Sequence, residues 1–218
     1  MVASGAETNL EQIIALSPDV VIMGAMAQDD AQIQQLESAG VSVVETNASD
    51  IQGVYDAIRL LGKVTGRSDS AEDLVKEMEE GFAAVAKRAG DATKSIYFEV
   101  SPLEYGLWTA GNHTFMQELC GLLGLKNCFS DVSGWAEISE EQVLQRNPDY
   151  IATVTMYYGE GPTPDEEIVS RQGWDSVTAV KEGRIYCADN DMLTRPGPRL
   201  VEAARLLADF VYGPESDG

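Results

Sequence analysis

Apolar residues recur along most of the chain with the spacing of short helices that alternate with short buried strands. In the first third, this spacing predicts helices over 9–16, 30–39 and 51–64, and uninterrupted apolar runs predict strands over 20–23 and 41–44. Short connections between such elements are typical of a parallel α/β sheet. Two strands make a poor sheet by themselves, so we expect something before residue 1 to be missing or supplied elsewhere.

Residues 68–89 interrupt this alternation, because their apolar positions recur at three- and four-residue steps over one long predicted helix. We interpret this helix as a rigid connector between two α/β lobes, of which the N-terminal one is incomplete. Beyond it the alternation resumes. The strands predicted there cover 95–100, 150–154 and 184–188, and the helices cover 115–123, 139–146, 173–180 and 199–212.

One arrangement occurs twice in the chain: a helix with a glutamate in its first turn, a Pro-Asp stop, and then a strand. Glu11 precedes the stop at 18–19, and Glu141 precedes the stop at 148–149. The second of these helices opens with the capping box that begins at Ser139. The repeat indicates that both lobes are built on the same plan.

The charge balance narrows the classes of partner. The 218 residues carry 15 Lys and Arg against 36 Asp and Glu, a net charge of −21. Nucleic acids and anionic lipids are polyanions, so the charge disfavours both as partners. No apolar run approaches a membrane span, and no signal peptide is visible at the start. The chain therefore begins either as a cytosolic protein or as an excised part of an exported one.

The three cysteines form neither a disulfide-rich framework nor a CxxC metal site. Cys120 and Cys128 are near enough in sequence to close a small loop in an exported protein. Two small buried apolar residues are the alternative. The sequence leaves this choice open.

Four segments, taken in order, resemble the solute-binding proteins of bacterial ABC importers for metal complexes: NLEQIIALSPDVVI, SDSAEDLVKEMEEGF, GWAEISEEQVLQRNPDYI and TRPGPRLVEAARLLADFVYG. Members of that family take iron–siderophores, haem or vitamin B12, and have two α/β lobes bridged by one long helix. The resemblance implies a partial N-terminal lobe over 1–67, the connecting helix over 68–91 and a C-terminal lobe over 92–218. It also implies that further βα units, after a signal peptide or lipoprotein anchor, are missing from a truncated chain. An extracytoplasmic location, in the periplasm or on the cell surface, follows from the same resemblance.

The resemblance implies a protein that binds a metal complex between its lobes, without enzyme activity and without a cofactor of its own. Ligands of α/β sheets lie beyond the carboxyl ends of the strands, so the loops there are the places to search. Aromatic rings and a guanidinium group suit a large conjugated or anionic ligand through stacking and charge-assisted hydrogen bonds. The candidate ligand-binding residues are Tyr105, Trp108, Trp135, Tyr157, Tyr158 and Arg195.

For three of these candidates a purely structural role is the alternative. Trp135 and Tyr157 are core residues in that interpretation, and Arg195 forms a surface ion pair. Trp108 and Tyr158 have glycine-rich neighbours, which predicts exposed loops.

The resemblance also implies one surface glutamate on each lobe that docks onto arginines of the permease. By their motifs these are Glu11 and Glu141. The alternative is that acids in the first turn of a helix only favour the helix dipole. Besides the permease, a second copy of the chain is a candidate partner, since it would cover the open edge of the incomplete sheet.

The choice of ligand depends on single positions. Gly24 and Met192 stand where vitamin B12 binders of the family can present tryptophan, which weakens cobalamin as the ligand. Haem would need an axial Tyr or His, and the chain's one histidine, His113, lies beside a predicted helix cap at Asn112. The sequence therefore favours an iron–siderophore complex. The alternatives are cobalamin, haem, or a fragment that no longer binds a ligand.

An enzyme with a two-lobed cleft is the hypothesis from another class. The sequence has no Gly-x-Ser-x-Gly elbow, no P-loop, no GxGxxG after a strand and no His/Cys cluster. It therefore predicts binding without catalysis and without a resident metal.

Overall fold

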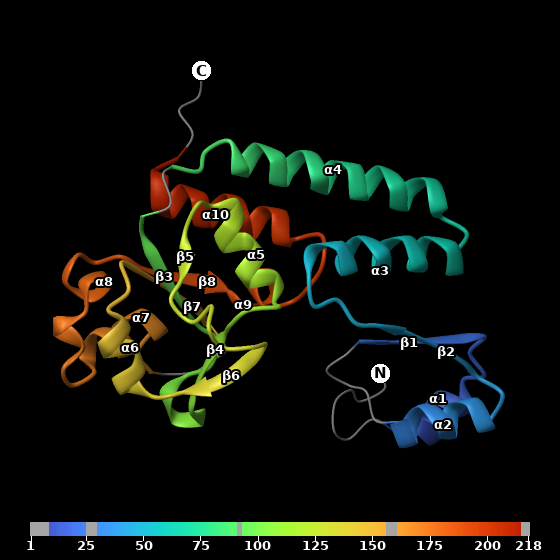
Figure 1. The fold of residues 1–218 in the computed structure, drawn as a ribbon. Coiled ribbons are helices and arrows are strands. Elements are labelled where there is room, and N and C mark those ends of the chain that lie inside the picture. The colour runs from blue at the N-terminus through green and yellow to red at the C-terminus, as the bar shows by residue number, and fades with distance from the viewer. Residues whose placement is uncertain (1–8, 25–29, 91–92, 156–160, 215–218) are drawn as a thin grey trace. The chain divides into compact units, whose positions relative to one another are not determined.

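The chain folds into two compact units, which comprise residues 1–48 and 49–218. The computed structural model describes residues 9–24, 30–90, 93–155 and 161–214, drawn in colour in Figure 1. The predicted α/β class is confirmed, since each unit contains parallel strands together with helices. The boundaries predicted at residues 67 and 91, with the helix between them as a connector, stay a prediction. In the described part of the chain, no helix combines the length and the apolar character that crossing a bilayer requires.

The first unit consists of two helices and two strands, all of which lie where the apolar pattern predicts them. Their bounds are α1 Leu10–Ala15, β1 Val20–Gly24, α2 Asp30–Ser38 and β2 Ser42–Thr46. The two strands pair in parallel. Met23, Leu36 and Val41 are its buried apolar residues in the described part, with partly buried neighbours around them. The unit therefore has a small core.

Three long helices form one layer of the second unit. They are α3 Ile51–Val64, α4 Ser68–Ala86 and α10 Leu200–Tyr212. Figure 1 shows α4 running along both α3 and α10. The predicted apolar stripe of α4 is buried, and α4 contacts both of these helices. A Cβ on Gly81 would collide with the side chain of Val201, so the glycine allows α4 and α10 to touch.

The second unit contains a four-stranded parallel sheet in the order β5-β3-β7-β8. The strands are β3 Ser95–Glu99, β5 Lys126–Asn127, β7 Tyr150–Thr155 and β8 Ile185–Asp189. Tyr97, Phe98 and Ile151 are fully buried, as continuous apolar runs predict. The other helices are α5 Phe115–Leu122, α6 Glu140–Arg146, α7 Pro164–Ser170, α8 Thr178–Lys181 and α9 Asn190–Leu193, with 3₁₀ turns η2 Leu103–Tyr105 and η3 Trp174–Ser176.

The apolar pattern does not predict the small antiparallel sheet formed by β4 Leu107–Ala110 and β6 Trp135–Ile138. Each strand has four residues and a glycine beside it, and short segments among glycines have the sequence character of loops. The prediction that Trp108 lies on a loop is therefore wrong, because Trp108 lies in β4. Pairing with a partner distant in sequence forms these strands, and local propensity does not reveal it.

Candidate functional site

The register of β4 and β6 places two predicted ligand-binding residues on one face of the small sheet. Trp108 lies opposite Glu137, and Ala110 lies opposite Trp135. Side chains two positions apart on a strand share a face, as do directly opposite residues. Trp108 and Trp135 are therefore diagonal neighbours on the same face. Leu107 and Thr109 point to the other face and are buried.

Both tryptophans are partly exposed, although Leu107, Thr109 and Ala110 beside Trp108 are buried. Trp108 is 39% exposed and Trp135 is 40% exposed. The ring of Trp135 packs edge-on against buried Phe115, with 5.7 Å between the ring centroids. The interpretation of Trp135 as a core residue is therefore wrong, since one side of the ring is supported and a large part of the residue remains in solvent. Such a ring offers a pre-organised stacking surface.

The turn that leads into β4 contributes further exposed apolar side chains, a few residues before Trp108 in the sequence. Tyr105 is 72% exposed and Leu103 is 37% exposed, and both lie in η2. Together with Trp108 and Trp135, these residues are four large exposed apolar side chains between positions 103 and 135. A concentration of exposed apolar side chains in one region marks a binding surface more often than scattered ones do.

Glu137 is the residue of this face that sequence reasoning missed. It is exposed and lies directly opposite Trp108 in the ladder. The alternation of apolar and polar residues from Trp135 to Ile138 is the signal that indicates a strand there. That alternation would have placed Glu137 and Trp135 on one side.

Of the remaining candidates, Arg195 is the one that the described residues place. Tyr157 and Tyr158 lie outside the described residues. Arg195 is exposed and its Nε lies 2.6 Å from Oδ1 of Asp191, so a surface ion pair occupies its charge. This corresponds to the alternative that the sequence leaves open for Arg195.

The carboxyl end of β3 holds a buried ion pair in place of an open ligand site. Glu99 is 2% exposed, and its two carboxylate oxygens accept hydrogen bonds of 2.7 and 2.8 Å from Arg171. The hydroxyl of Tyr97 donates to the same carboxylate at 3.2 Å, and Glu167 accepts from Arg171 as well. Burial raises the pKa of the Glu99 carboxyl, and the bonds from Arg171 and Tyr97 oppose that rise. All charged atoms are paired, so this cluster is structural.

The same cluster continues to the helix that carries Glu141. The guanidinium of Arg171 lies over the ring of Trp174, 4.5 Å from its centroid. The indole nitrogen of Trp174 donates to the carboxylate of Glu140 at 2.7 Å, and Glu140 is the first residue of α6. The first turn of α6 is therefore tied to the buried core of the second unit.

The two predicted docking glutamates occupy equivalent positions. In α1 the side chain of Asn9 caps the helix by accepting from the backbone N–H of Gln12 at 3.0 Å, and in α6 the side chain of Ser139 accepts from Gln142. Glu11 and Glu141 are thus the second residue of their helices, and both are exposed. Hydrogen bonds from its own backbone N–H and from Ser139 lower the pKa of Glu141. The internal repeat extends to the capping of the two helices.

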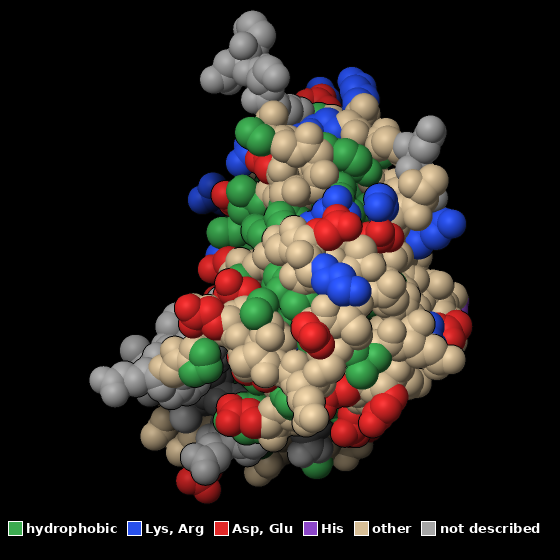
Figure 2. Space-filling model, turned by 90° about the vertical axis from the view of Figure 1, so that its left-hand side faces the viewer, with side chains coloured by type: hydrophobic (Ala, Val, Ile, Leu, Met, Phe, Trp, Pro, Cys, Tyr) green, Lys and Arg blue, Asp and Glu red, His purple; other side chains and the backbone are tan. Residues whose placement is uncertain are grey.

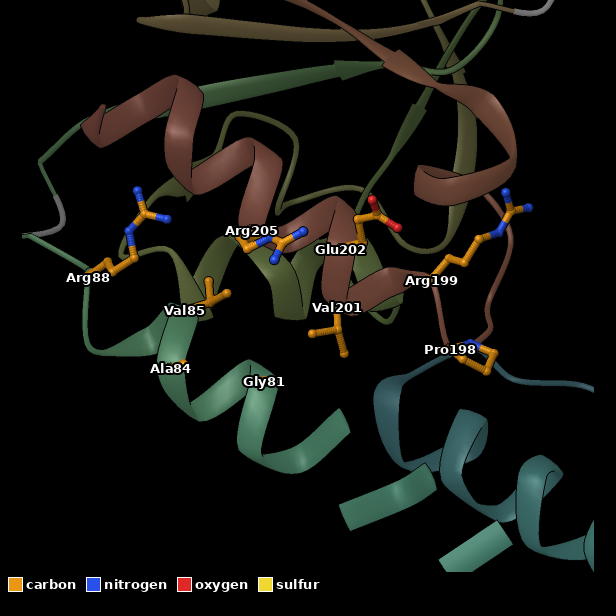
Figure 3. A pocket seen from close by; sticks show the side chains of 9 residues that line it. All are labelled: Gly81, Ala84, Val85, Arg88, Pro198, Arg199, Val201, Glu202 and Arg205. Atoms are coloured by element: carbon orange, nitrogen blue, oxygen red, sulfur yellow. The ribbon is translucent and has the colours of Figure 1, made fainter. Parts of the chain in front are cut away.

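A groove lies between α4 and α10 in the second unit (Figure 3). Its volume is about 590 Å³, and Arg88, Arg199 and Arg205 line it together with small apolar residues. Arg88 pairs with Asp209 at 2.7 Å, and Arg199 lies 4.0 Å from Asp191. Among its described lining residues the groove has no aromatic ring, so it lacks the flat faces that a large conjugated ligand requires.

Further observations concern the cysteines, the acidic residues and the cap of α5. Cys120 and Cys128 are separate thiols, and burial raises the pKa of Cys128 to about 11. The described residues contain no group of three or more His, Cys, Asp and Glu that could hold a metal ion. The cap of α5 is Thr114, whose side chain accepts from the N–H of Gln117, and not Asn112 as predicted.

Comparison with known proteins assigns the chain to a family. A family model described as "Periplasmic binding protein" matches residues 2–192. The chain belongs to this family. The family consists of solute-binding proteins, which confirms the prediction of binding without catalysis, and the resemblance stated from the sequence is confirmed with it.

Three relatives illustrate the likeness. An uncharacterized ABC transporter substrate-binding lipoprotein, YvrC of Bacillus subtilis, is 34% identical over 211 residues, which are 94% of this chain and 65% of YvrC. The vitamin B12-binding protein of Salmonella typhi is 28% identical, over 92% of this chain and 72% of that protein. A crystal structure described as a "possible" iron-binding (periplasmic solute-binding) protein of Staphylococcus epidermidis is 30% identical with a TM-score of 0.79, over 94% of this chain and 81% of that one. The chain therefore spans about two thirds to four fifths of the length of these relatives.

Proposed function

We propose that this chain is the substrate-binding component of an ABC importer for a metal chelate and that it works outside the cytoplasm. The observation that carries the proposal is the exposed face of β4 and β6, with Trp108 and Trp135 as diagonal neighbours. Membership of a solute-binding family, together with relatives that are periplasmic or lipoprotein binding proteins, supports the role and the location.

The ligand that we propose first is an iron–siderophore complex, and the 30% identical S. epidermidis protein supports it. Cobalamin is the second candidate, and the likeness to vitamin B12-binding proteins of Salmonella supports it. Both ligands are broad complexes whose faces can lie against indole rings. In this proposal the metal arrives already chelated, and the ligand is bound through the rim and faces of the chelate.

Titration of the whole chain with ferrioxamine B, cyanocobalamin and haemin, followed by tryptophan fluorescence, tests the proposal. Trp108 and Trp135 are half-exposed and should be quenched by a bound chelate, whereas Trp174 is fully buried. We expect Trp108→Ala and Trp135→Ala each to weaken binding about tenfold, which corresponds to roughly 1.4 kcal/mol. Val169→Ala, which truncates an exposed apolar side chain on α7, is the matched control and should leave affinity unchanged. Failure of every chelate to bind would contradict the proposal.

The permease is the protein partner that we propose, with Glu11 and Glu141 as its contacts. Their equivalent positions in α1 and α6 support this, since one carboxylate would be presented by each repeat. We expect Glu11→Ala combined with Glu141→Ala to abolish chelate uptake by cells that carry the importer, with unchanged affinity in solution. Glu202→Ala removes a first-turn acid from α10 and is the control for a mere dipole effect. A loss of affinity in the double variant would contradict the docking role.

A further inference from the structure

We infer that Glu137 makes the face of β4 and β6 discriminate by charge, so that it accepts uncharged or cationic chelates and rejects anionic ones. The inference deepens the proposed function and rests on it, because it requires the chelate to lie against Trp108 and Trp135. It follows from the position of Glu137 next to both tryptophans in the ladder, from the lack of a Lys or Arg partner for it among the described residues, and from the chemistry of a carboxylate.

The position of Glu137 is set by the antiparallel register. Glu137 lies directly opposite Trp108 and two residues after Trp135 on the same strand. Directly opposite residues have Cβ atoms about 5 Å apart, and residues two apart on a strand lie about 7 Å apart. Glu137 is therefore a direct neighbour of both tryptophans, and a chelate that lies against the two rings comes close to its carboxylate at the Trp108 end of the face.

The turn before β4 lies close to the carboxylate of Glu137. Gly106 has a φ of +84°, and a Cβ built on it would lie 3.0 Å from Oε1 of Glu137. The carboxylate therefore lies against a stretch of backbone that carries no side chain. Glycine serves both requirements here, the left-handed backbone and the close approach of the oxygen.

The charge of Glu137 has no counter-ion in the described part of the chain. No Lys or Arg of the described residues forms an ion pair with it, whereas Asp131, six residues earlier, pairs with Arg146. From Ser95 to Gln145 the sequence contains one base, Lys126, against seven acids. Lys126 lies in β5 opposite Ser95, at the start of β3, and not at the carboxyl end of that strand. Figure 2 shows the Lys and Arg side chains of the viewed face mostly in its upper half, where α4 and α10 lie.

A carboxylate accepts hydrogen bonds and cannot donate them, so its preference among ligands has a definite sign. A tricatecholate complex of Fe³⁺ or a haem with propionates would place negative charge beside Glu137 and meet no cation there. Amide or ammonium groups on the rim of a chelate would donate to Glu137 and be favoured. The class of ligand that fits is therefore a neutral or cationic chelate with N–H donors at its edge.

The experiment compares two ferric chelates of opposite charge, ferrioxamine B as the cation and a ferric tricatecholate as the trianion, on the whole chain at low and high salt. We expect the wild type to prefer ferrioxamine B at least tenfold, Glu137→Gln to reduce this preference about tenfold, and Glu137→Lys to reverse it. The preference should also shrink as salt rises, because screening weakens it. Glu77→Gln removes the same charge from an exposed position on α4 and should leave the preference unchanged.

The outcomes separate this inference from the proposed function. If ferrioxamine B binds and Glu137→Gln changes the preference by less than twofold, charge discrimination by Glu137 is wrong while the binding role stands. A wild type that prefers the trianion leads to the same conclusion. If no chelate binds the wild type, the proposed function and this inference both fail. Unfolding curves of the variants establish that an exposed substitution has left the fold intact.

Discussion

The same connection between helix and strand occurs in both units, but only the second unit holds it with side-chain contacts. Ser17 and Asn147 have nearly the same left-handed backbone, with φ of 47° and 45°, and each precedes a Pro-Asp pair and a parallel strand. In the second unit the carboxylate of Asp149 accepts from the N–H and the hydroxyl of Ser95 and from Lys94, at 2.9 to 3.0 Å. Asp19 makes no such bond within the described residues. The two connections therefore have similar local sequences and similar backbone geometry, but they differ in the side-chain hydrogen bonds that hold them.

The two units also differ in the size of their buried cores. The first unit buries Met23, Leu36 and Val41, whereas the second buries residues 96–99 and 150–154 of two sheet strands and encloses an ion pair. Unit 1 also carries no Lys or Arg, since Arg59 is the first base of the chain. Hydrophobic burial scales with the area removed from water, so the second unit should provide most of the resistance to unfolding.

Removal of the buried guanidinium should have the largest effect on stability. Arg171→Met leaves Glu99 buried without its partner, and we expect the free energy of unfolding to fall by about 3–5 kcal/mol. Arg195→Met breaks an exposed pair with Asp191 and should cost at most about 1 kcal/mol. Urea unfolding followed by circular dichroism measures both. A loss below 1 kcal/mol for Arg171→Met would show that the cluster is not a structural element of the second unit.

Matched Leu→Ala substitutions compare the two cores directly. Leu36 and Leu207 are both about fully buried, in the first and the second unit. Truncation of a buried leucine costs about 2–5 kcal/mol, and the lower end applies where the surroundings can collapse. We expect Leu207→Ala to lower global stability, and Leu36→Ala to reduce amide protection in residues 9–48 with little change elsewhere. Native-state hydrogen exchange distinguishes the two, and a uniform loss of protection from Leu36→Ala would mean that the units unfold together.

The sequence predicted most of the elements because their signals are local. The helix spacing over 51–64 and 68–89, the Pro-Asp stops and the capping box at Ser139 all depend on residues within a few positions of one another, and the second of these helices ends at Ala86 in the structure. The small sheet of β4 and β6 depends on the pairing of residues 25 to 31 positions apart, and the local alternation over 135–138 indicates one strand without its partner. Trp108 and Trp135 are candidates by residue type alone, whereas Glu137 becomes one only through its position opposite Trp108.

Prediction from the sequence has the same limit for charged residues, because their partners come from other segments of the chain. The sequence offers Arg195 as a cation for the ligand, but folding places it beside Asp191. It gives no sign that Arg171 would be buried, because a buried pair forms only when Glu99 arrives from 72 residues away. Which charges remain unpaired is a property of the tertiary structure, and Glu137 acquires its importance in that way.

The two aspartates test whether contacts or geometry support the connection. Burial alone would raise the pKa of Asp149, but hydrogen bonds from Ser95 and Lys94 outweigh this and lower it. We expect Asp149→Asn to cost about 1–2 kcal/mol at neutral pH and Asp19→Asn less than about 0.5 kcal/mol. Because the folded-state pKa is lowered, the contribution of Asp149 is complete above the unfolded-state pKa of about 3.9 and is lost as the pH falls through the folded-state pKa. Thermal melts of wild type and Asp149→Asn should therefore converge below about pH 4; a constant difference down to pH 2 would contradict the ionised contact.

Substitution of the two left-handed residues, Ser17 and Asn147, should have the smallest effect on stability. Glycine relieves the cost of a positive φ but loses more conformational entropy on folding, so Ser17→Gly should change stability by less than about 0.5 kcal/mol. Asn147→Gly also removes the side-chain oxygen that accepts from the N–H of Thr178 at 2.7 Å, at the start of α8. That loss should cost about 1 kcal/mol, because the N–H keeps no protein acceptor. Equal effects of the two substitutions in denaturant unfolding would show that backbone strain, and not the contact to α8, decides the stability of this connection.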